Sequence, residues 1–362
     1  MGYTFASRRA VRAARSTSFS PVASSNYYKQ GPGQPYSAYP IWYTPRSRVR
    51  PGRRTAIAVS ALSGGTAAAV TAFSAYMAYK VVRPQRKTLE THAEGGLLPA
   101  QKVCFKSSDG LNLSGYFYPH PYAHEAILIC HGFHGSSDDF QDPAITLQNL
   151  GYNVLTFDFR SCGGSEGRTS SAGFWEVRDV LGAIAYLKNR PEVDPQVIGL
   201  YGFSMGGATV IMAAAQSPDV KAVIADSAFA SLDEVLDACV KHFFGLPSFP
   251  FATTTAWFGE RFAKMVLKQV RPFEALAQIK HSGRQLPLFL IHGENDSVVP
   301  VSQVYKLYEV AAEPKQLWIV PNCRHVVAHH HDRAEYVGRI AAFFDKYLKT
   351  PQDEQFTAKN AE

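Results

Sequence analysis

The stretch VIGLYGFSMGGATVIMAAA, residues 197–215, decides how this chain folds. A run of apolar, strand-forming residues ends at Tyr201, the motif GFSMG (202–206) follows at once, and small apolar residues typical of a packed helix come next. This strand–turn–helix context is what a G-x-S-x-G nucleophile elbow needs, because the sharp turn lifts the serine hydroxyl above the sheet. The stretch therefore predicts that Ser204 is a nucleophile at the end of a buried strand.

The rest of the chain alternates strand and helix signals. VCFKSS and LNLSGYFYP, separated by the turn Asp109-Gly110, predict a hairpin. Further apolar runs are AILICHG, NVLTFDF, AVIADSA, LFLIHG and LWIVP, with helical patterns between most of them. Continuous apolar runs bounded by helices are typical of a parallel sheet that is covered on both faces. We therefore expect an α/β fold.

A second match to the serine motif lies at GGSEG, residues 163–167. It follows the run NVLTFDF only after Arg160-Ser161-Cys162, and polar residues come after it instead of a helical pattern. The motif alone carries little weight, since two glycines and a serine at this spacing often arise by chance. We expect a flexible loop beside the site, and Ser204 rather than Ser165 as the nucleophile.

A nucleophilic serine needs a base to take its proton and an acid to orient that base. The acid candidate is Asp296 in GENDSVVP, on the turn that leaves the strand PLFLIHG, where such a sheet collects its active site. Glu294, two residues nearer the strand, is the alternative. An Asx turn before Pro300 would explain the same composition without any catalytic role. We expect Asp296 to be the acid.

The base should follow the last strand, LWIVP, where residues 321–336 hold four histidines. His325 comes after a short exit loop and would fall back over the sheet edge. His329, His330 and His331 lie where an amphipathic helix starts, and three successive residues splay around a helix axis rather than converge on a metal ion. The spacing of His325 and His329 only half fits a metal-binding pair. We therefore expect His325 to be the base, and no metal site.

A developing oxyanion needs backbone donors. The N–H of Met205 lies at the start of the predicted helix, and the stretch LICHGFHGSSDDF places Phe133 straight after another strand, where its N–H can pair with that of Met205. We expect His131 and His134 to hold this loop by hydrogen bonds. Asp226 ends a further strand and is expected to be structural.

Charge is distributed unevenly along the chain. The formal charge is +7, but residues 1–89 hold fourteen Lys or Arg and no acidic residue, which leaves 23 basic against 30 acidic residues in the remainder. A basic tail on a mildly acidic globule argues against a nucleic-acid-binding core and for a tail that meets anionic lipid or serves targeting. Residues 1–55 cannot bury enough surface to fold and are predicted to be disordered. Residues 351–362 form a polar C-terminal tail.

The segment AIAVSALSGGTAAAVTAFSAYMAY, residues 56–79, has no charge. As a helix it would span about 36 Å, longer than the ~30 Å hydrocarbon core of a bilayer. Ala, Ser, Thr and Gly dominate it, which is weak for a spanning helix but suits close helix contact in lipid. We expect a single-pass transmembrane anchor and a membrane protein, with the side left open; a targeting region and a soluble Ala-rich helix are the alternatives. Residues 80–100 then form a linker to a folded domain at 101–350.

The five cysteines argue against a disulfide framework or a zinc site, because they are odd in number, widely spaced and contain no Cys-x-x-Cys pair. We interpret them as free thiols. They are Cys104, Cys130, Cys162, Cys239 and Cys323.

These motifs resemble the serine-hydrolase branch of the α/β-hydrolase superfamily: HG-x-x-G, G-x-S-x-G, G-x-x-D and a late histidine occur in order within residues 101–350. DSAFASLDEV, PFEALAQI and HGENDSVVP are similar to relatives of the BEM46/ABHD13 type, which group with serine-aminopeptidase-like and lysophospholipase-like hydrolases. DFRSCGGSEG departs from the many relatives that carry Gly-His-Gly there. The resemblance implies an α/β-hydrolase fold with a mostly parallel eight-stranded sheet, helices on both faces, and a small helical cap at about residues 233–286.

The resemblance also implies hydrolysis of an ester, thioester or amide through an acyl-enzyme, without cofactor or metal. The Phe-rich cap region and the predicted anchor favour a carboxylic ester with a lipid-like or acyl group as the small-molecule substrate. Alternatives are a peptidase or thioesterase that uses the same triad of Ser204, Asp296 and His325, or a non-catalytic scaffold with a hydrolase fold. We expect no nucleic-acid partner and no specific protein partner.

Overall fold

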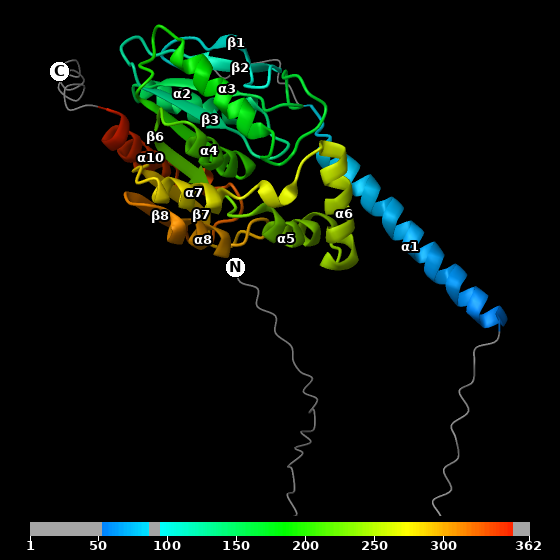
Figure 1. The fold of residues 1–362 in the computed structure, drawn as a ribbon. Coiled ribbons are helices and arrows are strands. Elements are labelled where there is room, and N and C mark those ends of the chain that lie inside the picture. The colour runs from blue at the N-terminus through cyan, green and yellow to red at the C-terminus, as the bar shows by residue number, and fades with distance from the viewer. Residues whose placement is uncertain (1–52, 87–94, 350–362) are drawn as a thin grey trace, which may run out of the picture. The chain divides into compact units, whose positions relative to one another are not determined.

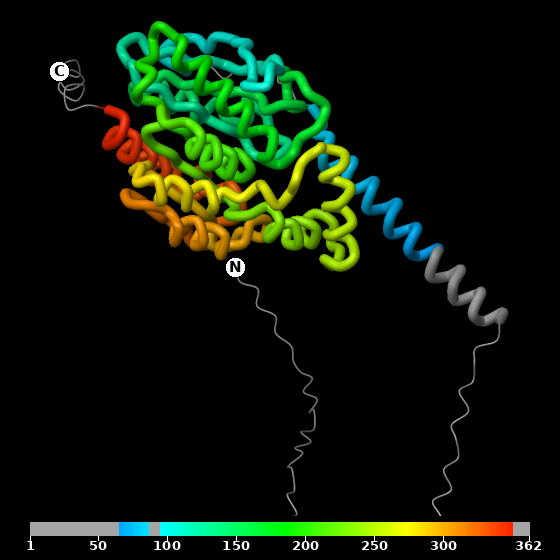
Figure 2. Tube along the Cα trace, in the orientation of Figure 1, coloured from blue at the N-terminus to red at the C-terminus, as the bar shows by residue number. Residues whose placement is uncertain are grey.

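The computed structural model describes residues 53–86 and 95–349, which Figure 1 shows as a ribbon and Figure 2 as a tube. Apart from its last three residues, the tail predicted at 1–55 lies outside the described residues, and so does the C-terminal tail at 351–362.

Eight strands of the described chain form one sheet in the order β1-β2-β4-β3-β5-β6-β7-β8. The strands are β1 (Gln101–Lys106), β2 (Asn112–Tyr118), β3 (Ala126–Cys130), β4 (Asn153–Phe157), β5 (Ile198–Phe203), β6 (Val220–Asp226), β7 (Leu288–Gly293) and β8 (Lys315–Val320).

The prediction of a mostly parallel sheet was wrong, because the sheet is mixed. The turn at Asp109-Gly110 reverses the chain, so β1 and β2 pair antiparallel, and β2 also pairs antiparallel with β4. The remaining neighbours, from β4 through β3 to β8, are parallel. The apolar runs that indicated parallel strands belong to this second part of the sheet, and the hairpin adds an edge of the other kind.

Helices cover both faces of the sheet (Figure 1). One core cluster joins the sheet to α3, α4, α7 and α8, and a second joins it to α2 and α10. On β3, Leu128 and Cys130 belong to the first cluster and Ile127 and Ile129 to the second, and all four side chains are buried. Burial on both faces explains why the central strands are continuously apolar. The helices are α2 (Gln141–Asn149), α3 (Glu176–Lys188), α4 (Met205–Gln216), α7 (Pro272–His281), α8 (Ser302–Val310) and α10 (Arg333–Leu348).

Between β6 and β7 the chain leaves the sheet and forms α5, α6 and η2 before α7 returns to it. α5 packs against α6, whereas α7 packs against α4 and α8. These extra elements are α5 (Leu232–Phe244), α6 (Ser248–Ala263) and the short 3-10 helix η2 (Leu267–Gln269); η1 (Ser137–Phe140) precedes α2, and α9 (Ala328–His331) precedes α10.

The helix α1 (Arg53–Val82) contains the segment predicted to cross a membrane. Within the part of the chain that the structure describes, no helix combines the length and the apolar character that a membrane crossing requires. The predicted transmembrane helix at 56–79 and the single-pass membrane localisation were therefore wrong. The physical reason is composition, because Ala, Ser, Thr and Gly contribute too little apolar surface per residue.

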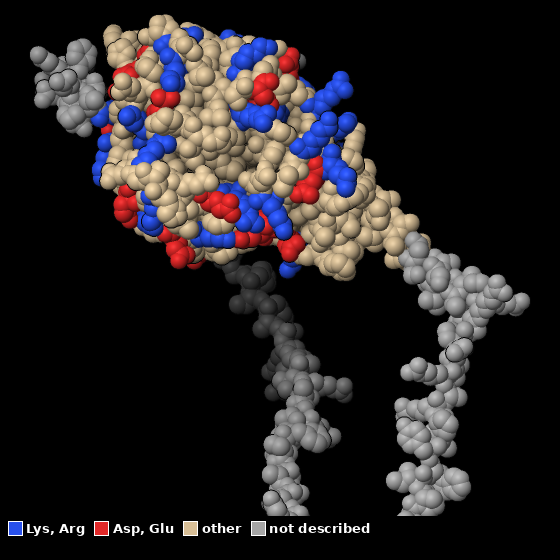
Figure 3. Space-filling model, in the orientation of Figure 1, with Lys and Arg blue, Asp and Glu red and all other residues tan. Residues whose placement is uncertain are grey.

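The C-terminal half of α1 packs against α6. The Ser74 side chain is fully buried, and its Oγ accepts a hydrogen bond from Thr254 Oγ1 at 2.6 Å. The rings of Phe73 and Phe251 meet edge to face, with centroids 6.0 Å apart. Figure 3 shows that charged side chains of both signs are interspersed over much of this face of the molecule, but are sparse over the lower end of α6 and along the described part of α1.

Candidate active site

Ser204 lies at the sharp turn between β5 and α4. Its backbone angles are φ 52° and ψ −117°, which residues with a side chain rarely adopt. Such a conformation costs about 1–3 kcal/mol and persists only where the surroundings enforce it. Here the Ser204 N–H donates to the Asp226 carbonyl oxygen at 2.8 Å, which ties the turn to the end of β6.

The two glycines of the elbow are required by close backbone packing. A Cβ at Gly202 would lie 2.4 Å from the Gly206 carbonyl oxygen, and a Cβ at Gly206 would lie 2.3 Å from that of Cys130. Both distances are shorter than any real contact, so only glycine lets α4 approach β5 and β3 this closely. The motif therefore fixes where Ser204 sits relative to the end of β3.

The structure brings Ser204, His325 and Asp296 into one hydrogen-bonded row. The distance from Asp296 Oδ2 to His325 Nδ1 is 2.6 Å, and that from His325 Nε2 to Ser204 Oγ is 2.9 Å. Because Nδ1 faces a carboxylate, it carries the proton and Nε2 can accept from the serine hydroxyl. Their catalytic roles remain predictions from the sequence.

Asp296 is held by its own loop. Its Oδ1 accepts hydrogen bonds from the backbone N–H of Val298 at 2.9 Å and of Val299 at 2.8 Å, which leaves Oδ2 for His325. His292 on β7 lies behind it, with Nε2 donating to the Val299 carbonyl oxygen at 2.9 Å. Burial lowers the pKa of His292 and so favours its neutral form. Sequence reasoning missed His292, although a histidine inside the apolar strand LFLIHG is a detectable signal.

The alternatives to Ser204 and Asp296 point elsewhere. Ser165 is fully buried; its Oγ donates to the Asp158 carbonyl oxygen at 2.5 Å and accepts from the Ser114 N–H at 2.9 Å. The exposed Glu294 accepts a hydrogen bond from the Asn322 N–H at 3.0 Å. These contacts give both side chains a structural role.

The segments that carry the two expected oxyanion donors meet at Ser204. Met205 begins α4, and the loop after β3 passes so close that a Cβ at Gly132 would lie 3.5 Å from Ser204 Cβ. Phe133 follows in this loop, which we call the oxyanion loop, residues 131–136. His131 Nδ1 donates to the Gly132 carbonyl oxygen at 2.7 Å.

His131 also ties the oxyanion loop to the end of β4, because its Nε2 accepts from the Phe159 N–H at 3.0 Å. Burial lowers the pKa of His131, so the ring stays neutral and can donate from one nitrogen while it accepts at the other. This bonding matches the expectation that His131 holds the loop.

A buried carboxyl group supports the loop that carries His325. Ser227 Oγ donates to Asp226 Oδ1 at 2.8 Å and accepts from the Val326 N–H at 3.2 Å. Tyr336 donates to Asp226 Oδ2 at 2.6 Å. Burial raises the pKa of Asp226 to about 6. Asp226 is thus linked to the residue next to His325, and its position at the end of a buried strand was the only signal in the sequence.

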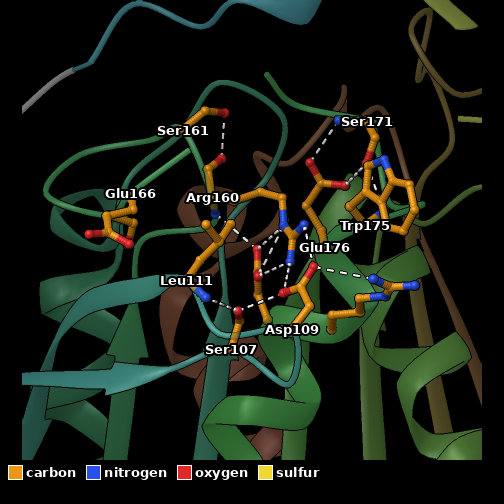
Figure 4. A network of polar contacts seen from close by, with 12 residues as sticks. Ser107, Asp109, Leu111, Arg160, Ser161, Glu166, Ser171, Trp175 and Glu176 are labelled. Atoms are coloured by element: carbon orange, nitrogen blue, oxygen red, sulfur yellow. Dashed lines mark hydrogen bonds and ion pairs between the residues drawn. The ribbon is translucent and has the colours of Figure 1, made fainter. Parts of the chain in front are cut away.

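The stretch GGSEG, which we expected to be flexible, belongs to a loop at residues 158–168 that is extensively hydrogen-bonded (Figure 4). The Arg160 guanidinium is bonded to Asp179 Oδ1 at 2.7 Å and to Asp109 Oδ1 at 2.8 Å. Burial alone would raise the pKa of Asp109, but hydrogen bonds from Arg160 and Ser107 outweigh it and lower the pKa to about 2. These contacts fix the loop to the β1–β2 turn and to α3.

The remaining histidines of the C-terminal cluster lie on α9. The ring of His329 packs near Phe203 and Tyr336, and burial lowers its pKa to about 4. Among residues 53–86 and 95–349, no group of three or more His, Cys, Asp or Glu side chains is arranged to hold a metal ion.

The fold and the nucleophile elbow define a serine hydrolase of the α/β-hydrolase superfamily. Residues 139–351 match the Prolyl oligopeptidase family. Because the match covers more than half of the chain, the chain belongs to that family. The resemblance to the α/β-hydrolase serine hydrolases is thereby confirmed, and with it the class of hydrolases.

Individual proteins are also similar to this chain. YqkD of Bacillus subtilis, an uncharacterized protein, is 30% identical over 241 residues, which are 66% of this chain and 77% of YqkD. The thiohydrolase apmlB of Arthrinium phaeospermum is 37% identical over 129 residues, 35% of this chain and 42% of that protein. The structure of the Pyrococcus furiosus esterase PF2001 matches with a TM-score of 0.63 and 26% identity, over 75% of this chain and 100% of the esterase.

Proposed function

We propose that this protein cleaves a carboxylic ester through an acyl-enzyme formed on Ser204. The observation that carries the proposal is the row of hydrogen bonds from Asp296 Oδ2 to His325 Nδ1 at 2.6 Å and from His325 Nε2 to Ser204 Oγ at 2.9 Å. A serine activated in this way is a nucleophile for acyl groups.

In the first half of the reaction, the Ser204 Oγ proton moves to His325 Nε2 as Oγ bonds to the acyl carbon. The carbonyl electron pair moves onto its oxygen, which accepts hydrogen bonds from the N–H groups of Phe133 and Met205; one such donor contributes about 2.7–4 kcal/mol in the transition state. The oxyanion then collapses, the ester C–O bond breaks, and His325 gives its proton to the departing alcohol.

In the second half, a water molecule gives a proton to His325 Nε2 and its oxygen bonds to the acyl carbon. Collapse of this intermediate breaks the bond to Ser204 Oγ, which takes the proton back from His325, and a carboxylic acid leaves. Asp296 keeps Nδ1 protonated throughout and stabilises the imidazolium that forms in each half.

The substrate class is suggested by the elements beside the loop that carries Asp296. The cap, which we place at about residues 233–286, begins with α5, where Cys239 Sγ lies 3.8 Å from the Val298 carbonyl oxygen and His242 Nδ1 lies 3.1 Å from Ser297 Oγ. Large apolar side chains of the cap are exposed, namely Phe243, Phe249, Trp257 and Phe262. Exposed apolar surface of this kind marks a site of interaction, and it favours an ester with a lipid-like or acyl chain.

A thioester is the second candidate. One relative, apmlB, is a thiohydrolase, and the same row of three residues would attack a thioester carbonyl. Membership of the Prolyl oligopeptidase family raises a peptide bond as a third possibility for the scissile group.

A fluorophosphonate probe tests the nucleophile. It should label the wild-type chain and Ser165→Ala, but not Ser204→Ala. A folded wild-type chain that stays unlabelled would contradict the proposal and favour a scaffold without catalysis.

Three substrates that share one acyl or aminoacyl group then separate the reaction classes: a nitrophenyl ester, the matching thioester and a nitroanilide. We expect the ester to give the highest kcat/KM, and a rise from a butyryl to a decanoyl chain. Faster turnover of the thioester would assign the second candidate.

A further inference from the structure

The last turn of α1 contacts the loops around the candidate active site. The Val81 carbonyl oxygen accepts a hydrogen bond from His134 Nε2 at 2.8 Å. The next carbonyl, that of Val82, accepts from the Ser170 N–H at 2.8 Å. The carbonyls at the end of a helix have no partner within it, so they are free to serve other segments. Here they accept hydrogen bonds from the oxyanion loop and from the loop before α3.

Arg86, four residues beyond α1, binds the 158–168 loop through three backbone carbonyls. Its Nη1 donates to the Gly163 oxygen at 3.1 Å and to the Ser165 oxygen at 2.6 Å, and its Nη2 donates to the Gly167 oxygen at 2.9 Å. A planar guanidinium with five donors suits this arrangement, and charge-assisted bonds are stronger than neutral ones. Arg86 therefore holds GGSEG, the second match to the serine motif, in one conformation.

Two hydrogen bonds that hold the oxyanion loop lead to these residues. On one side, His131 is bonded to the N–H of Phe159 in the 158–168 loop, which Arg86 binds. On the other side, His134 is bonded directly to Val81. The oxyanion loop is thus held from two directions by the end of α1 and the residues after it.

We propose that Val81 and Arg86, which we call the α1 clamp, position the oxyanion loop over Ser204, so that the reactivity of Ser204 depends on α1. The inference rests on the proposed function, because it concerns the donor that Phe133 offers to the oxyanion. The clamp residues are positioning residues, since neither of them lies in the row formed by Ser204, His325 and Asp296. A displacement of about 1 Å at an oxyanion donor is enough to slow the chemical step about 100-fold.

Two substitutions loosen the clamp in different ways. Arg86→Gln removes the guanidinium that binds three carbonyls. His134→Phe removes the donor to Val81 but keeps a ring in the stack with Phe133, whose centroid lies 4.0 Å away. Arg83→Gln is the matched control, because the Arg83 guanidinium lies over Tyr79 within α1.

The experiment measures the rate of fluorophosphonate labelling, kcat and KM for a nitrophenyl ester, and the unfolding temperature, all on the full-length chain. We expect Arg86→Gln and His134→Phe to lower kcat and the labelling rate about 10- to 100-fold, with KM changed less than about 2-fold. Arg83→Gln should behave as the wild type, and all chains should stay folded at the assay temperature.

The outcomes separate the two proposals. A wild-type chain that labels, together with clamp variants that label equally fast, would overturn the clamp and leave the proposed function intact. Loss of activity in both variants only with loss of the fold would assign the clamp to folding and would also overturn its positioning role. A wild-type chain that does not label would contradict the proposed function, and the clamp with it.

Discussion

Two regions of this molecule carry the same G-x-S-x-G motif and use it in opposite ways. Around Ser204 the motif joins a strand to a helix, and the hydroxyl faces His325 Nε2 at 2.9 Å. Around Ser165 it forms a loop, and the hydroxyl is buried between the Asp158 carbonyl and the Ser114 N–H. The backbone context of the motif, more than its five residues, therefore decides whether its serine faces a base or is buried within a loop.

Exchanging each serine for alanine should separate the regions most strongly. Ser204→Ala should lower kcat about 10⁴-fold or more with an unchanged unfolding temperature, because the nucleophile is lost and little packing changes. Ser165→Ala should keep its activity but lose about 1–3 kcal/mol of unfolding free energy, since the buried Asp158 carbonyl loses its donor and the Ser114 N–H its acceptor. Steady-state kinetics and urea unfolding measure both effects. Loss of activity in a folded Ser165→Ala chain would contradict the structural role of Ser165.

The acid beside Ser204 gives the next largest effect. Asp296→Asn should lower kcat by about 10⁴-fold, because the amide no longer keeps the proton on His325 Nδ1. Glu294→Gln should retain nearly full kcat, since Glu294 is exposed and binds the Asn322 N–H. A larger loss with Glu294→Gln than with Asp296→Asn would reassign the acid.

The two regions should also respond to pH with opposite signs. Beside Ser204, the pKa of Asp226 is raised from 3.8 to about 6 by burial, so its stabilising contribution is complete below about pH 4 and is lost as the pH rises through 6. This loss corresponds to about 3 kcal/mol of unfolding free energy. From pH 4 to pH 7 the wild type should therefore lose unfolding free energy relative to Asp226→Asn. Urea unfolding at several pH values measures this change. A difference independent of pH would mean that Asp226 is ionised without penalty.

The region around Ser165 should show the smallest change of unfolding free energy with pH. Its stability should fall as the pH is lowered, whereas that of the region around Ser204 falls as the pH is raised. The pKa of Asp109 is lowered to about 2, mainly by Arg160 and Ser107 acting against burial, so its contribution is present above about pH 4 and is lost as the pH falls through 2. Since Asp109 is partly exposed, solvent screening limits this contribution to about 1 kcal/mol. Acid unfolding of Asp109→Asn against the wild type measures it, and equal acid midpoints would contradict the assignment.

Much of the fold could be predicted because its signals are local. Apolar runs gave the eight strands, and the elbow gave the turn at Ser204 from its strand, glycines and helix. The spacing also led to Asp296 and His325, which the structure places in hydrogen-bonding distance of one another. Their roles in catalysis are for the kinetic experiments to decide.

Two of the errors came from features that depend on distant parts of the chain, and the third came from the composition of one segment. Neither the sequence of β2 nor that of β4 specifies that the two strands pair, so the mixed edge of the sheet was missed. The uncharged stretch at 56–79 gave a helix, but its composition falls short of a membrane crossing. The flexible loop expected at Ser165 is instead fixed by Arg86 and Arg160, which lie outside the motif.

The contacts of α1 bear on which residues a shortened, active form of this chain must include. A division into tail, anchor, linker and catalytic module would cut the chain near residue 100, because every strand of the described residues follows that point. A shortened chain cut there would keep the sheet but lose the partners of His134, Ser170 and Thr254. The clamp proposal therefore predicts that the functional module starts inside α1, at about Phe73, whose ring contacts Phe251, and that a fusion partner should be joined before that residue.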